Sequence, residues 1–73
     1  MKLVYEHNGQ AVKEGDITKT FRGEPVVVTD FREPHKPSST GRVWVKFLDS
    51  ETDEPVGYSR EFFPGVIGAK WTV

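Results

Sequence analysis

Short runs of alternating apolar and polar residues recur along this chain, and each run is bounded by glycine, proline, asparagine or aspartate. Such runs are typical of half-buried β-strands, because successive strand side chains point to opposite faces of a sheet. No window of the sequence carries an apolar stripe at helical spacing for three turns. The sequence therefore predicts an all-β protein.

The expected elements follow one another with short connections. We expect strands over 2–6, 17–21, 25–32, 42–48, 56–62 and 69–73. The segment 65–68, with the sequence GVIG, has glycine at both ends and suits a single 3-10 turn before the last strand. The two prolines of the segment 33–41 favour extended backbone before each of them, so this segment is expected to be an irregular loop.

A chain of 73 residues without cysteine is expected to form one small domain, residues 1–73. Because the chain has no cysteine, neither a disulfide nor a cysteine-based zinc site can stabilise it. This composition is more typical of proteins from a reducing compartment. The first residues are too short an apolar run for a signal peptide, and no run approaches the roughly 18 apolar residues of a membrane span. We therefore expect a cytoplasmic protein without membrane contact.

Charge is distributed unevenly along the chain. The net charge of −1 argues against a dedicated nucleic-acid binder. From Arg32 to Lys46, however, the sequence has four cations and one acid, whereas the segment 49–54 has four acids and no cation. The sequence thus predicts a basic pole and an acidic pole, which are either solvated loops or surfaces that steer a partner.

The order of the expected strands, irregular loop, hairpin and 3-10 turn resembles that of small SH3-like barrels, over residues 13–73. The stretch EGDITKTFRGEPVVV is similar to the Gly-Asp start and following glycine of KOW-type barrels. The resemblance implies a barrel of five or six antiparallel strands. The acidic ALYDY-type start of peptide-binding SH3 domains is absent, so proline-motif binding is not implied.

The closing REFFPGVIGAKWTV, together with PHKPSSTGRVWVKF, also resembles short uncharacterised proteins encoded by tailed bacteriophages and prophages. This resemblance implies a phage or prophage origin. It implies no activity, because kinship at the level of the fold does not define a function.

No constellation for catalysis or for a cofactor is present. His7 and His35 lie in turn-like segments without the spacing of metal ligands. The acids of the segment 49–54 lack the central glycine of a calcium-binding loop. We therefore expect no enzyme activity, no metal and no cofactor.

The nine aromatic residues exceed what a thin core can enclose, so some should be exposed. Phe47 continues the apolar face of Val43 and Val45 and is the strongest core candidate. Trp71 and Phe63 flank the expected 3-10 turn and are predicted to pack beneath it.

Trp44, unlike these aromatics, is not expected to face the core, because alternation along the strand places it on the same face as Arg42 and Lys46. Tyr58 and Arg60 alternate in phase on the next strand and are predicted to lie across from it. The candidate partner-binding residues are Trp44, Arg42, Lys46, Tyr58, Arg60, His35 and Lys36.

The sequence supports a non-catalytic binding module that docks through this aromatic and basic strip on an acidic surface of a host or phage protein. A nucleic-acid-binding barrel that uses the same strip is the alternative, since such strips also stack bases and hold phosphates. A minor virion component is a third. The strip would not be a binding site if the loop 34–40 covers Trp44.

Overall fold

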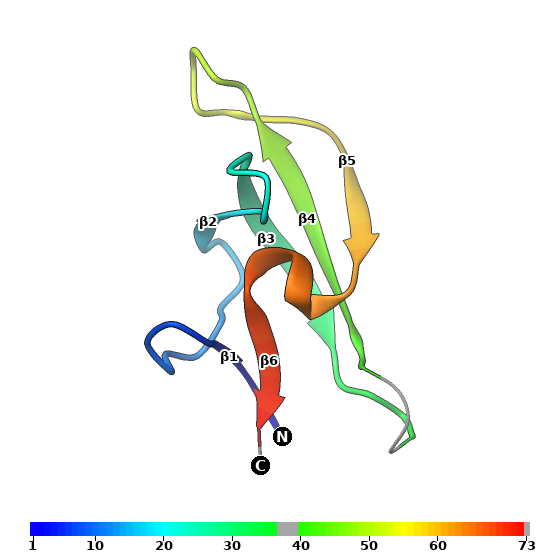
Figure 1. Ribbon diagram of the computed structural model, residues 1–73. Coiled ribbons are helices and arrows are strands. Elements are labelled where there is room, and N and C mark those ends of the chain that lie inside the picture. The colour runs from blue at the N-terminus through cyan, green and yellow to red at the C-terminus, as the bar shows by residue number, and fades with distance from the viewer. Residues whose placement is uncertain (37–39, 73) are drawn as a thin grey trace.

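The computed structural model describes residues 1–36 and 40–72. Within them lie six β-strands and one 3-10 turn, η1 (Figure 1). In chain order these are β1 (Lys2–Tyr5), β2 (Ile17–Lys19), β3 (Pro25–Arg32), β4 (Arg42–Leu48), β5 (Pro55–Phe62), η1 (Pro64–Ile67) and β6 (Ala69–Thr72). The predicted all-β class and the 3-10 turn before the last strand are confirmed. No helical segment of the described chain has the length and hydropathy that crossing a membrane requires.

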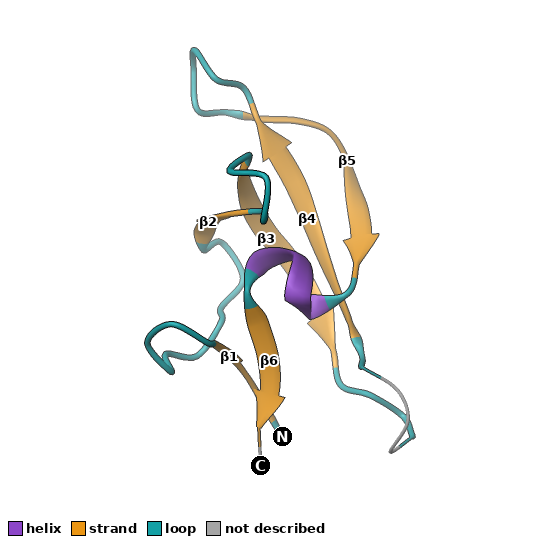
Figure 2. Ribbon diagram, viewed as in Figure 1, coloured by secondary structure: helices purple, strands orange, loops and turns teal. Residues whose placement is uncertain are grey.

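The strands form two antiparallel sheets (Figure 2). β2, β3, β4 and β5 follow one another in a four-stranded sheet, while β1 pairs with β6 in a two-stranded sheet. In the described part of the chain, no strand of one sheet pairs with a strand of the other. The predicted barrel is therefore open at the sheet edges rather than closed by hydrogen bonds.

β4 and β5 form the predicted antiparallel hairpin. Its pairing begins with Leu48 opposite Pro55 and ends with Val43 opposite Phe62. The register shifts within β5, where Gly57 adopts a positive φ of 74° that glycine accommodates without steric cost. β5 is an edge strand, and nearly all of it is exposed.

The core is built from the inner face of the four-stranded sheet and from the two-stranded sheet. Its fully buried centre consists of alternate valines of β3 and β4: Val26, Val28, Val43 and Val45. Around them pack the buried residues Leu3, Tyr5, Val12, Ile67 and Ala69. Alternation along the strands thus places one face of the sheet in the core and leaves the other outside, as the pattern predicts.

Phe47 fulfils its predicted core role only in part. Its ring is half-buried at the edge of the core, in an edge-on contact with Phe62 at 6.2 Å between ring centroids. The guanidinium carbon of Arg60 lies 5.3 Å from its ring centroid. Beside Phe47 is an open hollow that Val56 and Tyr58 also line. Phe47 is only half-buried because the two-stranded sheet covers the other end of the inner face of the four-stranded sheet (Figure 1).

Candidate functional site

Arg42, Trp44 and Lys46 lie on the outer face of the four-stranded sheet, as predicted. All three are half-buried and alternate with buried valines of β4. Trp44 is paired with Asp30 on one neighbouring strand and with Glu61 on the other. The prediction that Trp44 is partly exposed is confirmed, but acids as well as cations surround it.

Two arginines near Trp44 are engaged by neighbouring side chains. The guanidinium carbon of Arg32 lies 5.6 Å from the centroid of the Trp44 ring. The guanidinium carbon of Arg42 lies 4.6 Å from the ring centroid of Phe63, and its Nε is 3.4 Å from Oε1 of Glu61. Arg42 therefore connects the outer face of the sheet with the segment that leads into η1.

Tyr58 and Arg60 lie on the other face of β5, so the prediction that they face Trp44 is wrong. In the hairpin register, Glu61 is opposite Trp44 and Arg60 is opposite the buried Val45. Residues directly opposite each other share a face of the sheet, and a shift of one residue exchanges the faces. The register shift between Val45 and Phe47 contributes to this pairing, which separates Tyr58 and Arg60 from the other predicted site residues.

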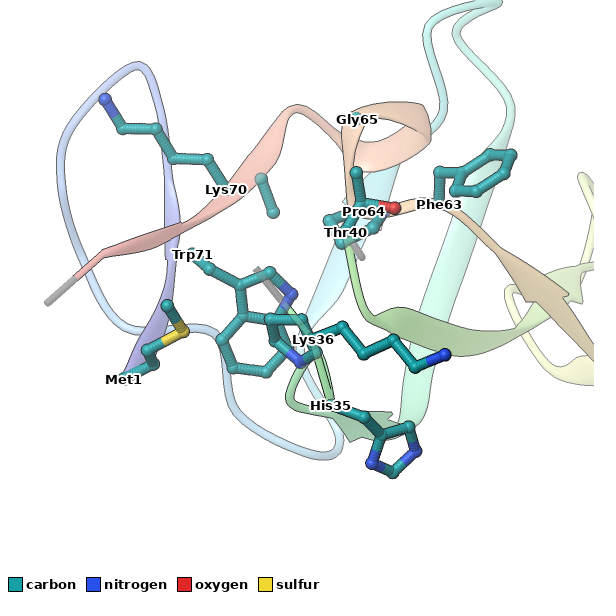
Figure 3. A pocket seen from close by; sticks show the side chains of 11 residues that line it. Met1, His35, Lys36, Thr40, Phe63, Pro64, Gly65, Lys70 and Trp71 are labelled. Atoms are coloured by element: carbon teal, nitrogen blue, oxygen red, sulfur yellow. The ribbon is translucent and has the colours of Figure 1, made fainter. Parts of the chain in front are cut away.

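His35 and Lys36 line a hollow between η1, β6 and the loop after β3 (Figure 3). Its volume is about 700 Å³, and we name it the η1 groove. The groove is lined by Met1, Pro34, His35, Lys36, Thr40, Phe63, Pro64, Gly65, Ala69, Lys70 and Trp71. Residues 37–39 lie outside the described chain, so closure of the loop 34–40 over Trp44 stays a prediction.

The turn η1 builds one wall of the groove. Pro64 is buried at its start, where the missing N–H of proline sacrifices no internal hydrogen bond. Gly68 ends the turn with a φ of 67°, and its N–H donates to the carbonyl of Gly65 at 3.1 Å. The chain then reverses into β6, which places Trp71 in the middle of the lining, as Figure 3 shows.

Trp71 is packed against the core, whereas Phe63 is not. The ring centroid of Trp71 lies 6.3 Å from that of Phe31, and its buried Nε1 has no hydrogen-bond partner among residues 1–36 and 40–72. Phe63 precedes η1 in extended conformation, and the residue is 57% exposed. The prediction that both aromatics pack beneath the turn is therefore wrong for Phe63, whose ring meets Arg42 rather than the core.

The rim of the η1 groove is basic. His35, Lys36 and Lys70 are exposed, and none of the described lining residues is acidic. In Figure 3 the side chain of Lys36 extends past Trp71, while that of Lys70 reaches outward at the opposite rim. The groove thus combines a fixed aromatic and proline surface with positive charge.

The sequence contains part of the signal for this groove. Phe63 and Trp71 flank the glycine-bounded turn, and His35 and Lys36 lie in the basic stretch. The approach of these two segments is not visible in the sequence, because they are far apart along the chain. Lys70 is the one groove cation that the sequence reasoning missed, since no neighbouring positive residue marks it.

The remaining polar clusters have structural partners. In the described part of the chain, no group of three or more His, Cys, Asp or Glu residues could hold a metal ion. The hydroxyl of Tyr5 donates to Oδ2 of Asp16 at 3.1 Å, and the same oxygen accepts the backbone N–H of Lys13 at 2.9 Å. The pKa of Tyr5 is raised to about 12, mainly by burial and to a smaller extent by the hydrogen bond to Asp16 and the charge of Asp16.

Comparison of the chain with protein-family models, with curated protein sequences and with solved structures gives no significant match. The candidate site therefore depends on the residues and geometry described above.

Proposed function

We propose that this chain is a non-catalytic protein-binding module whose η1 groove receives an exposed, acidic segment of a partner protein. The observation that carries the proposal is the lining of the groove: two aromatics and two prolines, with three basic residues at the rim and no acid among the described lining residues.

The apolar lining supplies the anchor for such a segment. Phe63 is an exposed residue beside the buried Pro64, and Trp71 is held in place by the core. Large aromatics in a fixed position contribute much of the affinity of protein interfaces, because little conformational entropy is lost when they bind. A hollow of about 700 Å³ is within the size range of ligand pockets.

The basic rim selects the charge of the partner. Lys36 and Lys70 attract carboxylates, and complementary charge around an apolar centre increases association rate and specificity more than affinity. Of the residues predicted from the sequence, His35 and Lys36 belong to this site, and Arg42 borders it through Phe63. The resemblance to phage proteins directs the search for the partner to host and phage proteins.

The test is a titration with a fluorescein-labelled peptide of repeated glutamate, proline and leucine, followed by fluorescence anisotropy. Proline keeps the peptide extended, and leucine supplies the apolar side chain. We expect saturable binding that Lys36→Glu weakens at least tenfold. Lys13→Glu is the matched control, because Lys13 is exposed and lies outside the lining of the groove.

Two further ligands make the test decisive. A peptide with lysine in place of glutamate should bind at least tenfold more weakly than the acidic peptide. An oligodeoxythymidine of equal length should not compete. Tighter binding of the oligonucleotide, with a steep loss of affinity on adding salt, would replace the proposal with a nucleic-acid-binding function. Equal binding of all three ligands would also overturn it.

A further inference from the structure

The acidic loop between β4 and β5 lies at one end of the molecule, whereas η1 and β6, whose residues line the η1 groove, lie away from that end (Figure 1). β4 has seven residues and spans about 20 Å at roughly 3.3 Å per residue. The loop follows its last residue, whereas the groove lies beside its first residues. The loop of one molecule therefore cannot reach the groove of the same molecule without breaking the sheet.

The acidic loop has a defined shape. The carboxylate of Asp49 accepts the backbone N–H groups of Glu51 at 2.8 Å and Thr52 at 3.2 Å. The backbone of Asp49 also bonds to that of Asp53 and Glu54, both at 2.8 Å. Residues 50–54 are all exposed, and in the described chain none of their carboxylates forms an ion pair. The loop is thus a preformed acidic projection, so little entropy is lost when it binds.

We propose that the acidic loop of one copy inserts into the η1 groove of a second copy. The proposal rests on the proposed function of the groove and names its partner as this same chain. Four acids in the segment 49–54 complement His35, Lys36 and Lys70, and no described lining residue of the groove would repel them. The net charge of −1 imposes little overall repulsion between copies.

Where a single loop enters a single groove between two copies, the interface is heterologous, because the two surfaces that it joins are different. Each added copy presents another loop and another groove, so the assembly grows head to tail instead of stopping at a dimer. The elongated molecule, 40 × 25 × 20 Å, suits a linear array of this kind.

Sedimentation velocity over micromolar to millimolar protein concentrations tests the proposal. In about 20 mM salt we expect the average mass to rise steadily above the monomer mass of 8.3 kDa. In about 500 mM salt, where exposed charges are screened, we expect mainly monomer. A wild-type protein that stays monomeric in low salt would overturn the proposal, and one that stops at a dimer would overturn the head-to-tail growth.

Two double variants identify the surfaces. Glu51→Gln with Glu54→Gln removes two of the four negative charges of the loop but keeps Asp49, which shapes it. Lys36→Gln with Lys70→Gln removes both lysine charges from the groove. We expect at least a tenfold weaker association for each variant alone. Their mixture should form a one-to-one complex and nothing larger, because only one intact loop and one intact groove remain. Growth of either variant like the wild type would contradict the proposal.

A control and the peptide titration separate the two proposals. Lys13→Gln with Lys19→Gln removes the same charge from exposed positions outside the groove and should associate like the wild type. If the acidic peptide binds the groove but the wild-type protein remains monomeric, self-association is wrong and the proposed function stands. If no acidic peptide binds but the copies still associate, the proposed function fails and another surface joins them.

Discussion

The Cα of Gly41 lies directly against the indole of Trp71, with no room between them for a side chain. A Cβ added to Gly41 would lie 2.5 Å from Nε1 of Trp71 and 2.5 Å from the carbonyl oxygen of Arg32. Gly41 also has a φ of 68°, in the left-handed region that other residues rarely adopt. This contact fixes the start of β4 against the back of the η1 groove.

Gly41→Ala should therefore destabilise the protein by about 2 to 4 kcal/mol, as the sum of backbone strain and overpacking. Gly9→Ala is the matched control, because Gly9 has a φ of 71° but nothing within 4 Å of an added Cβ. Its cost should be about 1 kcal/mol, from the backbone alone. Urea unfolding measures both, and equal losses for the two variants would show that Trp71 and the carbonyl of Arg32 both move away from the added methyl group.

Val45→Ala should cost about 2 kcal/mol, because Val45 is completely buried and its truncation leaves a cavity. Val56→Ala makes the same chemical change on the adjacent strand, where Val56 is 50% exposed, and should cost less than about 0.5 kcal/mol. Thermal melts of the two variants check this order. A larger loss of stability for Val56→Ala than for Val45→Ala would mean that the core is centred elsewhere.

The two tryptophans should differ in their effect on stability. Trp71→Ala should cost about 3 kcal/mol, because Trp71 packs against the core and against Phe31. Trp44→Ala should cost about 1 kcal/mol, since Trp44 lies on the outer face, and should reduce the affinity for the acidic peptide only a few-fold. Urea unfolding and the anisotropy titration measure the two effects. If Trp44→Ala unfolds the chain, the outer face has a structural role only.

Stability should decrease at alkaline pH because of Tyr5. Its pKa rises from 10.0 in the unfolded chain to about 12 in the folded protein. The folded state therefore holds its proton more tightly, and the resulting stabilisation is complete below pH 10 and is lost as the pH rises toward 12. A shift of this size corresponds to about 2.7 kcal/mol, and screening by solvent reduces the expected loss to on the order of 2 kcal/mol. Urea unfolding between pH 8 and 12 should show a steeper loss for the wild type than for Tyr5→Phe; parallel curves would contradict the assignment.

The sequence by itself determined the features that depend on neighbouring residues. The alternation through Val43, Trp44 and Val45 fixes which side chains face the core, because successive residues of any strand point to opposite faces. Pro64 and Gly68 likewise fix the turn η1 through their own backbone preferences. These features account for the all-β class, the hairpin and the partial exposure of Trp44.

Only the tertiary structure decided which of these local features meet. The hairpin register puts Glu61, and not Tyr58 or Arg60, across from Trp44. Register depends on the loop geometry and on packing against the rest of the core, and a one-residue difference moves every side chain to the other face. In the same way, the pairing of β6 with β1 places Trp71 in the same groove as His35, although the two residues are far apart along the chain and no local pattern brings them together. The groove is therefore a product of long-range packing.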